Sequence, residues 1–272
     1  MESLEFLQKS RRKKGYYAFE DVPDPGCPSV TTLLQVVSKP LLVNWAAKVE
    51  RDACLDVASS MWEEMNGKVQ VSKAGFVTSM EGRLGKAKQH AKKLAAAGDI
   101  GTAVHKHVEY TLRSAAGQVV EAPEPLTSVE ARDAFQNFLE WYAKNTIKPI
   151  LFEQVVRHLP HNYAGTLDLY AEIPEIAPYP LVIDWKTAKG IYFESAVQTA
   201  MYADALKWMG HAPGKVGSLV VRLPKSSREK VETKLYTPDE VDHYAEVGRS
   251  VCKLWQAQLD WTEGHGYDIA EA

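Results

Sequence analysis

The spacing of the apolar residues changes near residue 150, and this change limits the possible folds more than any other feature of the chain. Before it, apolar residues recur at helical spacing, as in 83–97 and 129–144. After it come segments rich in β-branched and aromatic residues, separated by proline, asparagine and glycine. The predicted strands are 151–158, 163–172, 181–185, 216–223 and 231–236, with helices at 193–209 and 238–262. This order predicts an α/β (α+β) fold with a central mixed β-sheet flanked by helices.

The first 97 residues are predicted to form a helical N-terminal region. Helical patterns cover 28–37, 42–66 and 83–97, and Gly98 is predicted to end the third helix, with Asp99 capping the next. A length of 272 residues suits one large domain, or a core with a helical appendage. We therefore expect a helical region at 1–97, belonging to the same domain as a core at 98–272.

The composition indicates a soluble protein of the cytoplasm. The longest apolar runs, such as 216–221, are too short to span a bilayer, and residues 1–6 show no secretory signal. The three cysteines lack a paired spacing, which favours reduced thiols. The net charge of −3 gives no global attraction to nucleic acid, so a nucleic-acid partner would need local basic patches.

Two aspartates are predicted to meet on one face of the sheet. Strand alternation places Asp168 on one face of 163–172, and places Asp184 and Lys186 together on one face of the next strand. If these strands pair as a hairpin, the two carboxylates approach each other and require a cation between them. Hard oxygen ligands favour Mg²⁺. The alternative is a solvated strand edge, but the apolar run 181–183 argues against solvation.

Several short motifs resemble those of the PD-(D/E)XK nucleases, in the branch that includes RecB-type nuclease domains. They are Gly165-Thr-Leu-Asp168, Val182-Ile-Asp184-Trp-Lys186, the G-x-x-x-H element Gly101–His105 and the Q-x-x-x-Y element Gln198–Tyr202. Residues 28–50 also look like the lead-in of phage-encoded and mitochondrial genome maintenance exonucleases. The resemblance implies a PD-(D/E)XK nuclease core over 98–272.

The resemblance also implies roles for individual residues. The expected catalytic residues are Lys186, Asp184, Asp168 and Glu153, and the expected metal ligands are His105, Asp168, Asp184 and the Trp185 carbonyl. The cofactor would be one or two Mg²⁺ or Mn²⁺ ions, and no iron–sulfur cluster is expected because its cysteine ligands are absent. Glu109 is a weaker alternative to Glu153. Lys186 would either orient or deprotonate the attacking water, or stabilise developing charge.

The predicted DNA-binding residues form two sets. Gln198 and Tyr202 share one helix face, and a basic stripe contains Arg83, Lys86 and Lys93. The aromatic residues Tyr16, Tyr17 and Phe19 are candidates for stacking on single-stranded bases, with burial as the alternative.

These patterns together predict a metal-dependent DNA exonuclease. Its partners would be DNA that is single-stranded or has free ends, and a recombination or replication protein. The alternatives are an endonuclease of the same fold and a catalytically silent nucleic-acid-binding module. The presence of Asp168, Asp184 and Lys186 together argues against the silent module.

Overall fold

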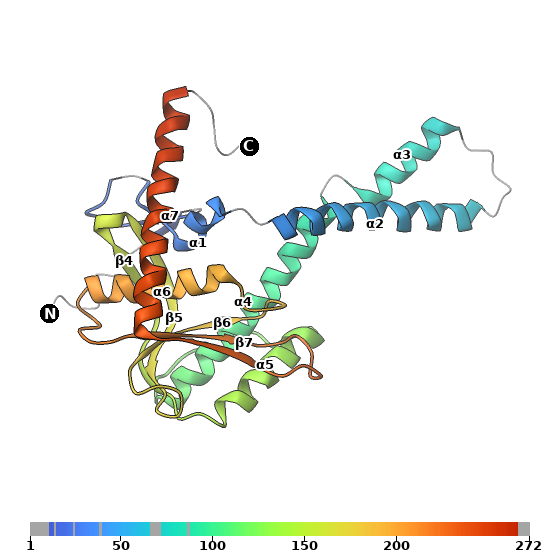
Figure 1. The fold of residues 1–272 in the computed structure, drawn as a ribbon. Helices are drawn as coiled ribbons and strands as arrows, with labels where there is room; N and C mark the ends of the chain where they lie inside the picture. The colour runs from blue at the N-terminus through green and yellow to red at the C-terminus, as the bar shows by residue number, and fades with distance from the viewer. Residues whose placement is uncertain are drawn as a thin grey trace. The chain divides into compact units, whose positions relative to one another are not determined.

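A computed structural model describes residues 11–13, 15–23, 25–37, 40–65, 72–85 and 88–265. The chain folds into two compact units, Met1–Val37 with Gly101–Ala272, and Ser38–Ile100. The helices are α1 (Val30–Leu33), α2 (Pro40–Met65), α3 (Lys73–Leu84), α4 (Gln89–Ala115), α5 (Val129–Tyr142), α6 (Phe193–Trp208) and α7 (Pro238–His265), with 3-10 turns η2 (Leu34–Val36) and η3 (Leu159–His161) (Figure 1). The strands are β1 (Arg11–Lys13), β2 (Tyr16–Ala18), β3 (Cys27–Pro28), β4 (Lys148–His158), β5 (Tyr163–Glu172), β6 (Leu181–Lys186), β7 (Gly217–Arg222) and β8 (Glu232–Tyr236).

The larger unit is built on a five-stranded sheet in the order β4-β5-β6-β7-β8. Strands β6 and β7 are parallel and the other neighbours are antiparallel, which confirms the predicted mixed sheet. The parallel strands β6 and β7 are buried along most of their length, and their apolar runs 181–183 and 219–221 suit burial on both faces. Helix α6 makes the crossover between them.

Helices cover both faces of this sheet, α6 and α7 on one side and α5 on the other (Figure 1). On the α5 side the Trp185 ring packs edge-on against Phe138 and Trp141, at centroid distances of 5.3 and 5.5 Å. Because side chains alternate along a strand, Asp184 and Lys186 point the other way, towards α6. The carboxyl end of β6 therefore carries its charged residues between the sheet and α6.

A small sheet, β1-β2-β3, precedes α1 and belongs to the larger unit. Tyr17 is buried there, and its hydroxyl bonds to Thr166 Oγ1 of β5 at 2.9 Å. The sequence predicted a mostly helical start and did not reveal this small sheet, because strands of two or three residues are too short to show a period. The turn before β3 needs Gly26, whose φ is +91° and whose added Cβ would lie 2.2 Å from the Tyr17 carbonyl oxygen.

In the smaller unit, Ser38–Ile100, the predicted helix 83–97 is wrong, because two different helices cover this range. Helix α3 ends at Leu84, where Gly85 has a φ of +71°, and α4 continues through Gly98 without a break. An isolated glycine costs a helix only about 1 kcal/mol, so Gly98 does not end it. Arg83 and Lys93 therefore lie on different helices and do not form one stripe.

The predicted basic residues of the smaller unit have different surroundings. Arg83 forms an ion pair with Glu64 of α2, whereas Lys93 is exposed on α4. Lys86 lies outside the described residues. In the part of the chain that the structure describes, every helix is too short or too polar to cross a membrane.

Candidate metal centre and active site

Strands β5 and β6 bring the two predicted aspartates together. Leu169 pairs with Ile183 and Tyr170 with Val182, and the same antiparallel register continued by one residue sets Asp168 opposite Asp184. The Trp185 backbone N–H donates a hydrogen bond to Asp168 Oδ2 at 2.9 Å. The antiparallel pairing expected from the sequence is thereby confirmed.

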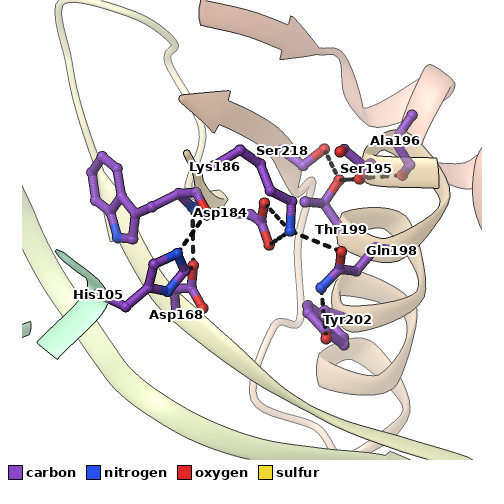
Figure 2. A network of polar contacts seen from close by, with 11 residues as sticks. His105, Asp168, Asp184, Lys186, Ser195, Ala196, Gln198, Thr199, Tyr202 and Ser218 are labelled. Atoms are coloured by element: carbon purple, nitrogen blue, oxygen red, sulfur yellow. Dashed lines mark hydrogen bonds and ion pairs between the residues drawn. The ribbon is translucent and has the colours of Figure 1, made fainter. Parts of the chain in front are cut away.

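Asp184 and Lys186 form a buried ion pair. Asp184 is only 2% exposed, and Lys186 Nζ donates to its Oδ1 at 2.9 Å and lies 2.8 Å from its Oδ2. Burial raises the pKa of Asp184 above its usual range, although the neighbouring ammonium opposes this rise. Burial lowers the pKa of Lys186, but the Asp184 and Asp168 carboxylates outweigh it and raise that pKa overall. The geometry thus keeps a lysine cation beside the carboxylates (Figure 2).

His105 reaches the same place from α4. Its Nε2 lies 2.8 Å from the Trp185 carbonyl oxygen, and its Nδ1 lies 3.5 Å from Asp168 Oδ2 (Figure 2). Gly101, one turn earlier, lets α4 approach the end of β6, since an added Cβ would lie 3.2 Å from Thr187 Oγ1. The glycine and histidine of the G-x-x-x-H element therefore both face the end of β6.

Comparison with known families decides what this arrangement belongs to. The sequence model of the PD-(D/E)XK nuclease superfamily matches residues 69–265, which is most of the chain. The chain belongs to the PD-(D/E)XK nuclease superfamily. Members of this superfamily are nucleases that hydrolyse nucleic acids with divalent metals. A search of curated proteins finds no matching relative.

Glu153 lies on the acidic side of the candidate centre. Pairing of Phe152 with Leu169 and of Gln154 with Leu167 brackets it opposite Asp168. Its φ of +42° is a backbone conformation that residues with a side chain rarely adopt. Burial, followed by the charges of Asp168 and Glu109, raises the pKa of the Glu153 carboxyl to about 8.

Arg113 supports this unusual backbone, and the sequence did not single it out. Its guanidinium lies over the Phe152 ring, 5.0 Å from the centroid, and donates to the Phe152 carbonyl at 3.3 Å. It also donates to Glu109 at 2.7 Å, so the Glu109 carboxylate is held by a neighbour on its own helix, α4. Glu109 stands outside the ligand cluster of the described residues, which consists of His105, Glu153 and Asp168.

The donor atoms of that cluster fit a divalent metal. One ligand atom from each of His105, Glu153 and Asp168 lies within 4.8 Å of the others. A carbonyl oxygen accepts only, so His105 Nε2–H donates to Trp185, and the Nδ1 lone pair of a neutral ring then faces Asp168 Oδ2. Two acceptors that face each other need a cation between them. Imidazole and carboxylate donors are an appropriate set for Mg²⁺ or Mn²⁺.

The structure also gives the surroundings of the other predicted site residues. Gln198 bonds Lys186 and is half-buried, whereas Tyr202 is 4% exposed and bonds Gln198. Tyr17 is buried as well, so of the two alternatives for this residue, base stacking and burial, the structure shows burial. The Trp185 carbonyl accepts from His105 in this structure, and its role as a metal ligand stays a prediction.

The raised pKa of Glu153 predicts a pH-dependent stability for the metal-free protein. Between its ordinary value of 4.5 and about 8, the folded state binds more protons than the unfolded state. The free energy of unfolding therefore falls as pH rises through this window. Glu153→Gln removes the buried charge, so its Tm in EDTA should exceed that of the wild type above about pH 8. The difference should vanish as the pH approaches 4.5.

Thermal melts in EDTA at a series of pH values measure this difference. Glu172→Gln, at the exposed end of β5, is the matched control and should leave the melting curve unchanged. A difference in Tm between wild type and Glu153→Gln that stays constant with pH would contradict the raised pKa of Glu153.

Proposed function

We propose that this nuclease is a Mg²⁺-dependent DNA exonuclease. It would remove nucleotides from free DNA ends, accept single strands, and act in the cytoplasm in recombination, repair or replication. The observation that carries the proposal is the cluster of His105, Glu153 and Asp168 beside the Asp184–Lys186 ion pair. It combines a site for a divalent ion with a lysine cation in one place.

The ligand set supports Mg²⁺ or Mn²⁺ at this centre. His105, Glu153 and Asp168 would hold one ion, and Asp184, which lies outside this cluster and pairs with Lys186, is the expected further ligand. Carboxylates and one imidazole suit hard, oxygen-preferring cations. Such an ion, when bound, activates a water and neutralises the phosphoryl oxygens.

Lys186 contributes a second positive charge. Its ammonium lies between the Asp184 carboxylate and the Gln198 side-chain oxygen, and both are acceptors. These contacts favour the charged form of the lysine. We therefore assign Lys186 to stabilising the negative charge that develops on the phosphate, rather than to accepting a proton from water.

Two features support an end-dependent exonuclease. The G-x-x-x-H and Q-x-x-x-Y elements resemble those of the RecB-type branch, which is rich in exonucleases. In addition, Lys93 of α4 is exposed, and a basic side chain there would bind the DNA backbone without reading bases.

The proposal predicts that DNA topology decides cleavage. Linear single-stranded DNA should be degraded with Mg²⁺, whereas covalently closed circles of the same sequence should survive. Gel analysis of both substrates over one time course measures this. Equal degradation of circles and linear strands would favour the endonuclease alternative, and full cleavage with no divalent metal would contradict the metal-dependent mechanism.

Lys93→Glu tests the DNA-binding surface. The variant should bind DNA more weakly, and the slope of log affinity against log salt should become shallower by at least about 1. Binding titrations with a labelled single strand in Ca²⁺ at several salt concentrations measure both. Lys253→Glu on α7 carries the same charge change at another exposed lysine and is the matched control. Equal behaviour of the two variants would remove Lys93 from the DNA-binding surface.

A further inference from the structure

A hydrogen-bonded chain leads from Tyr202 to the catalytic lysine. Gln198 Nε2 donates to Tyr202 Oη at 3.0 Å, and Lys186 Nζ donates to Gln198 Oε1 at 3.0 Å (Figure 2). Gln198 and Tyr202 are four residues apart on α6, so they lie one turn apart on the same helix face. The chain continues from Lys186 to Asp184.

The Lys186 ammonium decides which way the glutamine amide turns, and the tyrosine hydroxyl accepts from the amide nitrogen. A lysine ammonium only donates, so it requires the amide oxygen of Gln198 and not the amide nitrogen. The nitrogen then points away and needs an acceptor, which Tyr202 Oη supplies. Without this hydroxyl, the Gln198 N–H group would face an apolar ring and lose a bond worth about 1 kcal/mol.

Gly165 fixes the position of the Tyr202 ring from the opposite side. An added Cβ at Gly165 would lie 2.3 Å from Tyr202 Cε1 and 3.1 Å from Cζ, so only glycine leaves room for the ring. Gly165 lies on β5, three residues before Asp168. The strand that carries a candidate metal ligand therefore also seats the tyrosine.

Helix α6 is itself attached to the sheet by a buried polar contact. Thr199 Oγ1 and Ser218 Oγ of β7 are 2.9 Å apart, and both side chains are buried (Figure 2). Thr199 follows Gln198 directly, so this contact fixes the turn of helix from which Gln198 reaches Lys186. A flexible four-carbon lysine side chain is thereby held between a strand and a fixed helix.

We propose that Tyr202 and Gln198 are positioning residues that hold the Lys186 ammonium beside Asp184, with Gly165 as the seat of the tyrosine ring. The inference rests on the proposed function of Lys186 in DNA cleavage. It replaces the expectation that both residues bind DNA. Tyr202 is 4% exposed, so its ring has no surface on which a base stacks. Its hydroxyl is linked to Lys186 through the hydrogen bond with Gln198.

Tyr202→Phe is the decisive variant, because it removes the hydroxyl and keeps the ring. The turnover rate should fall about tenfold, as expected for one lost positioning hydrogen bond. The KM for DNA and the Kd for DNA in Ca²⁺ should stay within about twofold of wild type. Tyr163→Phe is the matched control, since it also loses a buried hydroxyl, which bonds the Met201 carbonyl and Asp204. It should lower the Tm without changing turnover.

A double variant separates positioning from packing. Gln198→Leu breaks the chain at its middle, so adding Tyr202→Phe should cause no further loss of turnover. Losses that multiply in the double variant would mean that Tyr202 acts independently of Gln198. That result would overturn the proposal.

The Lys186 ammonium gives a readout that needs no activity. Its ¹⁵N–¹H NMR signal should be visible in the wild type, where acceptors slow proton exchange, and should broaden in Tyr202→Phe. If the wild type cuts no DNA but this change occurs, the proposed function fails and the positioning role stands. If the wild type cuts DNA and Tyr202→Phe keeps both its turnover and the NMR signal, the positioning role fails alone. A raised Kd for DNA with unchanged turnover would also overturn the proposal.

Discussion

Replacing Asp184 with asparagine is expected to lower the rate of DNA cleavage at least about 100-fold, because the centre loses one of its negative charges. Asparagine keeps the shape of the side chain and an oxygen that still accepts from Lys186. Burial raises the pKa of Asp184 and so favours a neutral group, but the buried Lys186 ammonium loses its counter-charge, which lowers the free energy of unfolding. The Tm should therefore fall while the fold is kept, and the larger loss should lie in turnover. Single-turnover cleavage with saturating Mg²⁺, together with thermal melts, measures both.

Lys186→Ala should cause a loss of similar size. It removes the cation that faces Asp184, and the remaining buried carboxylate then takes up a proton more readily. Asp242→Asn, near the start of α7, loses an exposed ion pair with Lys207 of α6; it is the matched control and should keep full activity. Near-normal turnover in Asp184→Asn or Lys186→Ala would remove this pair from the cleavage mechanism.

The strands that carry the site were predictable because their patterns are long and bounded. Strand β5 has the predicted limits, Tyr163–Glu172, and β6 is one residue longer than predicted, because it ends at Lys186. Alternation along a strand has a period of two, so the faces of Asp168 and Asp184 follow directly once the strands pair. The match to the nuclease superfamily agrees with these motifs.

The limits of helices near glycine were harder to predict. Gly98 lies inside α4, whereas Gly85 ends α3 with a φ of +71°. Both are single glycines within a helical pattern, and a sequence does not state which of them adopts the left-handed conformation. The predicted basic stripe failed for this reason, since it required one helix to pass through Gly85.

The side-chain contacts around the site could not be predicted from the sequence either. Spacing of four residues placed Gln198 and Tyr202 on one helix face, but it does not identify what that face meets. The structure turns it inwards, to Lys186 and Gly165. Similarly, no local pattern indicates that Arg113 braces the backbone before Glu153, because the two residues are 40 positions apart and meet only in the fold.

Removal of divalent metal is expected to abolish cleavage. His105, Glu153 and Asp168 each offer a ligand atom within 4.8 Å of the others. Without an ion, the ionised carboxylates repel the phosphate, and the Lys186 ammonium is occupied by Asp184. EDTA should therefore stop the reaction, and excess Mg²⁺ or Mn²⁺ should restore it. Ca²⁺ should support DNA binding without turnover, because its longer and more variable ligand distances do not hold the reactants in line.

His105→Ala makes this prediction specific to the site. The variant keeps the three carboxylates and loses one neutral donor, so it should still bind metal, but more weakly. The Mg²⁺ concentration for half-maximal activity should rise about 10- to 100-fold, with much of the maximal rate recovered at saturation. His107→Ala is the matched control, since His107 lies on the same helix and packs against Phe135 instead. An unchanged Mg²⁺ titration in His105→Ala would reduce His105 to orienting the Trp185 carbonyl. Cleavage that persists undiminished in EDTA would contradict the metal centre as a whole.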